Sequence, residues 1–299
     1  MAKRARGSRA IDAGKIMRVI LGGLAALALS TNAWSADLLR GSTPAFGETR
    51  SYNWAGFYIG GSAGYASSSI NMTETARGLI SGLTANSFLN GTTADGTERN
   101  VSEWLTLPRQ TDTGATFGGF VGWNSQWGDI VLGTELNYTR YSLSAAASDS
   151  VSRFFVEDLF RFSTTVTGSA SATLIDYVGL RARAGYAWGW LLPYATAGIA
   201  IGRANYNATV SVGYPTPIDV TPPQVPPLPP RIPPSAFFDS TSIARSNVFS
   251  VGYTLGAGID IGLMPGVFVR AEYEFVQFAR FGGISAQVQN ARVGAAIKF

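Results

Sequence analysis

The chain has 299 residues, which suffices for one large domain or two small ones, and only 14% of them are charged. It contains neither cysteine nor histidine, so its own residues supply no disulfide, no thiolate metal site and no Ser-His-Asp triad. Six of the 23 basic residues but only one of the 19 acidic residues lie within residues 1–35, which leaves 17 basic and 18 acidic residues in the remainder. The basic pI of about 9.4 therefore reflects a leader, and we expect no binding to nucleic acid.

The first 35 residues have the three parts of a signal peptide. A basic segment ends at Arg18, an apolar run covers residues 19–29, and a small-x-small site ends at Ser35. The apolar run is too short to cross a bilayer as a helix, so export with cleavage after Ser35 is favoured over a membrane anchor. Met1 and Met17 both fit as the start of translation. We expect a signal peptide over residues 1–35, a periplasmic N-terminal segment over 36–53 and one barrel domain over 54–299.

After residue 53, eight segments alternate between apolar side chains and small or polar ones. The alternation is cleanest near the C-terminus, and the glycine- and alanine-rich early segments show it more weakly. A period of two residues predicts β-strands with one apolar face. In chain order the predicted strands are residues 54–67, 113–125, 131–138, 178–186, 191–204, 248–261, 267–276 and 291–299.

The connections between these strands alternate between long and short. Short turns are expected at residues 126–129, 187–190 and 262–266, whereas residues 68–112, 144–170 and 205–247 form long loops and 279–286 a moderate one. Transmembrane barrels place short turns in the periplasm and long loops outside, whereas a soluble β-sandwich has no reason to sort its loops in this way. We therefore expect an all-β fold, namely an eight-stranded antiparallel transmembrane β-barrel with long extracellular loops and short periplasmic turns.

Two of the long loops have a distinctive composition. Threonine, serine, asparagine and glycine dominate residues 71–100, which predicts a mobile, solvent-exposed loop. Residues 215–234 hold ten of the 14 prolines, which predicts an extended, polyproline-like segment. A stiff spacer is favoured over a recognition motif for the proline-rich segment.

Tryptophan is concentrated at one side of the predicted barrel. Five of the seven tryptophans lie at the periplasmic ends of predicted strands or in periplasmic turns. Amphipathic indole rings favour the membrane–water interface, so this distribution predicts an aromatic girdle. Its predicted members are Trp54, Trp123, Trp127, Trp188 and Trp190.

Charged residues near the strand centres fall on the glycine-containing faces, opposite the apolar faces. We interpret the charged faces as the inside of the barrel, because an outward Arg or Lys at mid-strand would cost about 2–4 kcal/mol in lipid. A paired network that fills the lumen is favoured over a constriction for small ions, since eight strands leave an interior only just wide enough for side chains. The predicted network contains Glu135, Arg181, Arg183, Asp260, Arg270, Glu272, Glu274 and Arg292.

Glu272 and Glu274 could also be compared with the paired carboxylates of a glycosidase. Neighbouring arginines would keep both acids ionised, so a role as salt-bridge partners is favoured. We expect no catalytic residues, no metal site and no cofactor.

Three segments resemble one known family. They are residues 54–61 (WAGFYIGG), residues 178–186 (VGLRARAGY) with 192–194 (LPY), and residues 292–299 (RVGAAIKF). The family is that of the small outer-membrane β-barrels of alphaproteobacteria, which include porin-like surface antigens of rhizobia. In this order, the three segments are similar to its opening strand, its central hairpin and its last strand. The resemblance implies insertion into the outer membrane by the barrel-assembly machinery, and Phe299 fits the C-terminal assembly signal of such proteins. The insertion at residues 215–234 departs from the compact members of the family.

These observations predict a non-enzymatic, monomeric barrel of the cell outer membrane that contributes to envelope structure and displays its loops at the surface. Its expected partners are outer-membrane lipid and, during insertion, the barrel-assembly machinery. Two alternatives remain at this point. One is a narrow porin for small solutes, and the other, less favoured, is a soluble lipocalin-like barrel, which would need an apolar lumen.

Overall fold

The computed structural model describes residues 52–91, 99–221 and 231–299, all within the unit Thr49–Phe299. The predicted signal peptide, residues 1–35, and most of the predicted N-terminal segment lie outside the described residues. The domain boundaries predicted from the sequence therefore stay predictions.

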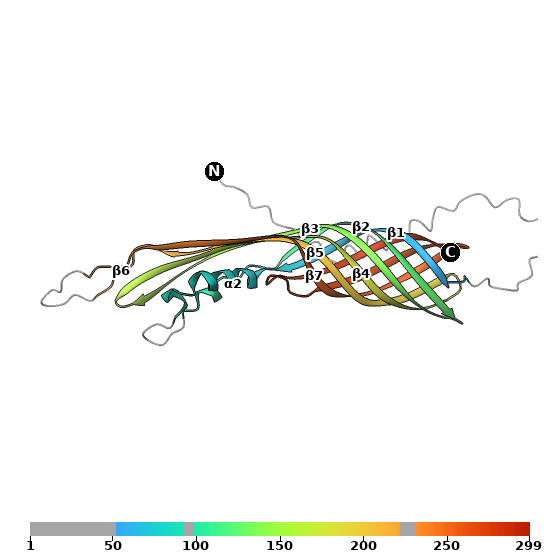
Figure 1. Ribbon diagram of the computed structural model, residues 1–299, viewed down its shortest axis with the longest axis horizontal. Coiled ribbons are helices and arrows are strands. Elements are labelled where there is room, and N and C mark those ends of the chain that lie inside the picture. Colours follow the sequence, from blue (N-terminus) through green and yellow to red (C-terminus); the bar gives the residue numbers. More distant parts are fainter. Residues whose placement is uncertain (1–51, 92–98, 222–230) are drawn as a thin grey trace, which may run out of the picture. The chain divides into compact units, whose positions relative to one another are not determined.

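Eight long strands form a closed antiparallel ring (Figure 1). The hydrogen-bonded order is β3-β2-β1-β9-β8-β7-β5-β4, and the pairing of β3 with β4 closes it. The two-residue strand β6 (Ile218–Asp219) pairs only with the start of β4. The predicted eight-stranded barrel is confirmed, with strands β1 (Gly56–Asn71), β2 (Gln110–Trp127), β3 (Ile130–Glu157), β4 (Phe160–Tyr186), β5 (Leu191–Tyr214), β7 (Phe237–Met264), β8 (Val267–Phe278) and β9 (Ser285–Lys298).

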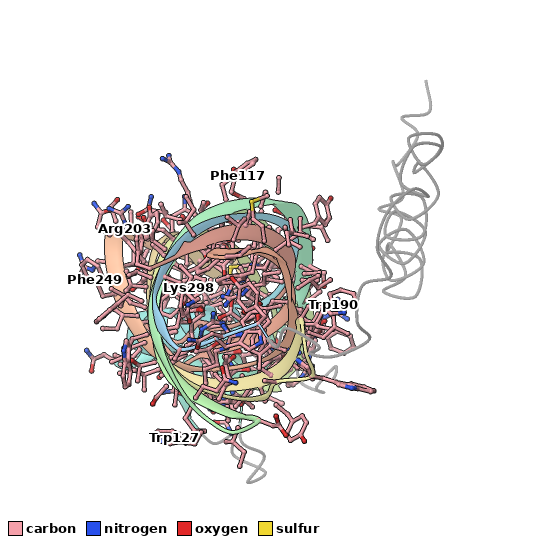
Figure 2. The ribbon with its side chains drawn as sticks, turned by 90° about the vertical axis from the view of Figure 1, so that its right-hand side faces the viewer. Phe117, Trp127, Trp190, Arg203, Phe249 and Lys298 are labelled. Carbon is pink, nitrogen blue, oxygen red and sulfur yellow. The ribbon has the colours of Figure 1, made fainter. Side chains whose placement is uncertain are left out.

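The apolar faces of the strands point away from the barrel and the mixed faces point into it. On β7, for example, Val251, Tyr253 and Leu255 are half exposed, whereas Thr254 and Asp260 are buried. The labelled Phe117 and Phe249 project outward in the view along the barrel (Figure 2). A soluble barrel has its apolar side chains inside, whereas this barrel has them outside, where they can contact the lipid of a membrane.

Three short turns join the strands at one end of the barrel, which we call the turn end. They lie between Trp127 and Ile130, between Tyr186 and Leu191, and between Met264 and Val267, as the sequence predicted. Gly128, Gly189 and Gly266 have φ of 58°, 62° and 80° in these turns. A positive φ is readily adopted by glycine, which explains why each turn contains one.

At the opposite end the predicted long loops at residues 144–170 and 205–247 are wrong in their extent, because much of each is strand. β3 and β4 contain 28 and 27 residues and meet at a tight turn at Asp158 and Leu159. β5 and β7 also continue past the ring, to Tyr214 and from Phe237. We call the resulting four-stranded sheet the extension; it consists of residues 143–157, 160–174, 206–214 and 237–245.

The start of the extension is marked by three irregularities at one level. The register shifts between Arg140 and Leu143 on β3, between Leu174 and Asp176 on β4, and between Ala204 and Tyr206 on β5. β-Bulges bend strands and increase their twist, so a row of them marks the change from a closed ring to an open sheet.

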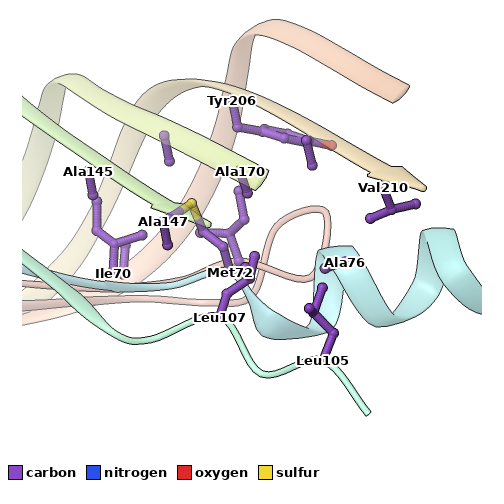
Figure 3. Packing of buried hydrophobic residues seen from close by; sticks show 14 of the residues in the cluster. Ile70, Met72, Ala76, Leu105, Leu107, Ala145, Ala147, Ala170, Tyr206 and Val210 are labelled. Atoms are coloured by element: carbon purple, nitrogen blue, oxygen red, sulfur yellow. The ribbon is translucent and has the colours of Figure 1, made fainter. Parts of the chain in front are cut away.

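The segment between β1 and β2 is folded, which corrects the prediction of a mobile loop for most of residues 71–100. It contains helix α2 (Thr73–Thr84) and two short 3-10 turns, η1 (Phe88–Asn90) and η2 (Val101–Glu103). Ile80 of α2 and Leu105 are almost fully buried in a cluster with extension residues such as Ala147 and Val210; Figure 3 shows Leu105 and the extension residues. No helix among residues 52–91, 99–221 and 231–299 is long and apolar enough to span a membrane.

Candidate functional site: a charged barrel interior

The structure brings all eight residues of the predicted charge network into the barrel interior. They come from five strands, and each is at most 5% exposed. Three acid–arginine pairs are direct neighbours on adjacent strands, namely Glu135 with Arg181, Asp260 with Arg270, and Glu272 with Arg292. The alternation of each strand fixes which side chains enter the lumen, and the strand register then brings opposite charges together.

Arg181 is at the centre of the network. One of its guanidinium nitrogens, Nη1, lies 2.5 Å from Glu272 Oε1 and 3.1 Å from Glu274 Oε1, and the other, Nη2, pairs with Glu135. Arg292 approaches the same two glutamates of β8, with Nη2 at 2.5 Å from Glu272 Oε1. One buried arginine therefore connects β4 to both β3 and β8.

A second group of pairs lies closer to the turn end. Arg270 Nη1 is 2.6 Å from Glu135 Oε2, and Arg270 Nε is 2.9 Å from Asp260 Oδ1. Arg183 Nη2 lies 2.5 Å from Asp260 Oδ2. Four arginines thus face four carboxylates, so acidic and basic members of the network are equal in number. Among the described residues, no group of three or more His, Cys, Asp or Glu is placed to hold a metal ion.

Tyrosines that the sequence analysis did not single out complete the network. Tyr58 Oη donates to Glu135 Oε2 at 2.8 Å, Tyr194 Oη donates to Glu272 Oε2 at 2.7 Å, and Tyr177 Oη donates to Glu274. The guanidinium of Arg183 also lies 3.7 Å from the centre of the Tyr194 ring. Each tyrosine lies an even number of residues from an inward-facing position of its strand. This alternation was the sequence signal that could have identified all three.

An apolar cluster occupies the lumen at the turn end, below the charges. Trp54, Phe120, Val131, Leu192 and Phe268 are its largest members besides Tyr58. Trp54 is 1% exposed, which corrects its predicted place in the aromatic girdle. It precedes β1, so strand alternation does not direct it outward. Its backbone N–H donates to Gln126 Oε1 at 2.8 Å, and its ring packs against Phe268.

The other four predicted girdle residues do project outward at the turn end. Trp123, Trp127, Trp188 and Trp190 are 44%, 61%, 74% and 57% exposed, and Figure 2 shows Trp127 and Trp190 outside the ring at different points of its circumference. Their placement suits the membrane–water interface, where an indole keeps an apolar body in lipid and its N–H near water.

The C-terminal Phe299 is 78% exposed, and its N–H donates to the carbonyl oxygen of Phe57 at 2.8 Å. The last residue therefore continues the hydrogen bonding between β9 and β1 while its ring stays free. The role of Phe299 as an assembly signal stays a prediction.

A closed ring with an apolar exterior and a charged, filled interior defines a transmembrane β-barrel. Comparison with family models matches residues 22–299 to the outer membrane protein beta-barrel domain, and the chain belongs to this family. This result confirms the family resemblance and the outer-membrane location predicted from the sequence, and it rules out the soluble lipocalin-like alternative.

The curated relatives include outer-membrane immunogenic proteins of Brucella species. The 25 kDa outer-membrane immunogenic protein of Brucella ovis is 28% identical over 182 residues, and that of Brucella abortus is 26% identical over 190 residues. Each alignment covers 61% of this chain, and 62% and 64% of the respective relatives. The chain thus spans somewhat less than two thirds of the length of these relatives.

Solved barrels show weaker similarity. Neisserial surface protein A is 11% identical with a TM-score of 0.32, over 82% of this chain and 98% of that protein. Ail, the attachment invasion locus protein of Yersinia pestis, is 13% identical with a TM-score of 0.30, over 82% of this chain and 99% of Ail.

Proposed function

We propose that the protein is a non-catalytic, non-conducting barrel that anchors a folded extension at the cell surface. The observation that carries this proposal is the filled interior, in which Glu135, Arg181 and Glu274 are each at most 1% exposed. An eight-stranded barrel has room for little besides its own side chains, and here these side chains bind one another. A narrow porin would need a continuous water path past these groups.

The orientation follows from the general design of outer-membrane barrels, in which short turns face the periplasm and long connections face the exterior. On this basis the turn end is periplasmic, and the extension and α2 stand outside the cell. The distant end of the extension carries exposed apolar side chains, with Phe154 at 75% and Phe238 at 73% exposure. These side chains are accessible for contact with a partner, which supports a display role.

The test is single-channel conductance of the folded, detergent-extracted protein in a planar bilayer. Insertion is verified independently by protease protection of the barrel. We expect a silent membrane over the full range of applied voltage. Defined and reproducible conductance steps would overturn the proposal and would make the buried arginines and glutamates selectivity residues of a narrow porin.

A further inference from the structure

A row of five side chains crosses the outside of the barrel at the foot of the extension. The strand register places Phe117 of β2 beside Arg140 of β3, Asp176 of β4, Arg203 of β5 and Phe249 of β7 in turn. Figure 2 shows Phe117, Arg203 and Phe249 pointing away from the barrel. Two arginines and one aspartate, flanked by two phenylalanines, thus form a continuous outward band, which we call the boundary row.

The boundary row lies where the outer surface changes from apolar to polar. The next row towards the turn end contains Tyr138, Val178, Ile201 and Val251, each between 42% and 58% exposed. On the other side, the first outward residues at the foot of the extension are polar, such as Ser144 opposite Thr173 and Thr173 opposite Asn205. The boundary row therefore lies at the level where the acyl chains of the membrane end and the lipid headgroups begin.

The charges of the boundary row are not balanced. Arg203 donates from Nε to Asp176 Oδ1 at 3.1 Å and from Nη2 to Oδ2, and Tyr138 Oη donates to the same carboxylate at 3.1 Å. Within the part of the chain that the structure describes, Arg140 has no hydrogen-bond or ion-pair partner. One carboxylate thus faces two guanidiniums, which leaves one excess positive charge and several free N–H donors.

We propose that the boundary row binds the phosphate group of an anionic lipid in the outer leaflet, an inference that rests on the orientation given under the proposed function. Arg140 and Arg203 lie on strands on either side of β4, about 10 Å apart at the backbone, so both long side chains can reach one phosphate. Guanidinium groups bind phosphate through paired, charge-assisted hydrogen bonds. The acyl chains of the same lipid would lie on Val178, Ile201 and Val251 directly below, which favours a membrane lipid over a soluble phosphate.

The experiment compares lipid binding by the full-length mature protein in phosphatidylcholine nanodiscs, measured by native mass spectrometry. The probe is a bisphosphorylated diglucosamine lipid, and the reference is the same lipid with its phosphates removed. The test variant is Arg140→Gln with Arg203→Gln. The matched control is Arg161→Gln with Arg245→Gln, which removes the same charge from exposed positions in the extension.

We expect the test variant to bind the phosphorylated lipid about tenfold more weakly, because hydrogen bonds to charged groups are lost, while the control binds like the wild type. Asp176→Asn should bind it more tightly, since it releases Arg203 from its internal partner. Resistance to SDS at room temperature reports that each variant is folded.

Equal binding by the test and control variants would overturn the proposal. Equal affinity of the wild type for the phosphorylated and dephosphorylated lipids would also overturn it. Displacement of the lipid by inorganic phosphate at equal concentration would show that a free anion suffices, which contradicts a lipid site.

Discussion

Arg270 Nη1 lies 2.6 Å from Glu135 Oε2, although 135 positions separate the two residues in the sequence. Their strands, β8 and β3, are not neighbours in the ring, so this contact crosses the lumen. The network therefore joins opposite walls of the barrel, and its cross-lumen pairs, unlike those between adjacent strands, can form only once the ring is nearly closed. We therefore expect that removing one partner, which leaves its counter-charge buried and unpaired, destabilises the closed ring.

Replacing Arg181 by alanine should destabilise the barrel by about 3–5 kcal/mol, because three buried carboxylates would lose a partner. The measurement is equilibrium urea unfolding in lipid vesicles, followed by tryptophan fluorescence. The exposed Arg161 provides the control, and its replacement by alanine should change the free energy of unfolding by no more than about 0.5 kcal/mol. Coincident unfolding curves for the two variants would show that the network contributes no stability.

Two substitutions in α2 should have opposite effects on its packing. Ile80→Ala removes a fully buried side chain and should cost about 2–5 kcal/mol locally. Gly78→Ala should stabilise the helix by about 0.5–1 kcal/mol, because a Cβ at Gly78 meets no neighbour within 4 Å. Trypsin cleavage at Arg77 measures local opening and should become faster in Ile80→Ala and slower in Gly78→Ala. Unchanged cleavage in both would indicate that α2 is open in solution.

The two tryptophan environments can be separated by fluorescence. A variant that retains only Trp190 should be quenched by lipids brominated near the headgroup, because its ring is exposed at the periplasmic end. A variant that retains only Trp54 should resist the same quencher, since its ring is enclosed by Tyr52 and Phe268. Strong quenching of Trp54 would place it in lipid and contradict the filled lumen at the turn end.

Phe299→Ala tests the C-terminal assembly signal. The ring is exposed and its N–H bond to Phe57 is a backbone contact, so the substitution should leave the stability of refolded protein within about 0.5 kcal/mol. In cells we expect less folded protein in the outer membrane and more in the periplasm, measured by heat-modifiable mobility after fractionation. Normal cellular assembly of the variant would show that the terminal ring is dispensable.

The alternation in the barrel wall could be predicted because its two faces differ strongly. Val251, Tyr253 and Leu255 face lipid while Thr254 and Asp260 face the lumen, so the hydropathy contrast between neighbours is large. The charged interior could be predicted from the same alternation of side chains. In a membrane-spanning strand, an Arg or Glu that faced the lipid would be destabilising, so it must face the lumen.

The extension could not be recognised in this way because its contrast is small. Its inner face uses alanines such as Ala145 and Ala172, and its outer face uses Ser and Thr such as Ser144 and Thr173. Small apolar and small polar residues alternate with little change in hydropathy, so strands that bury a real core resemble a polar loop. Trp54 was misplaced for a different reason, since it lies outside any strand and periodicity says nothing of its direction.

The filled interior also has a consequence for the number of copies of this protein that one outer membrane can hold. Each open pore adds a leak for ions and small toxic solutes, so pore-forming proteins are limited by the permeability the cell can withstand. On the proposed function, a barrel whose interior is occupied by Arg181 and its partners adds surface-exposed structure without adding such a path. Dense coverage of the cell surface would then be compatible with a tight permeability barrier.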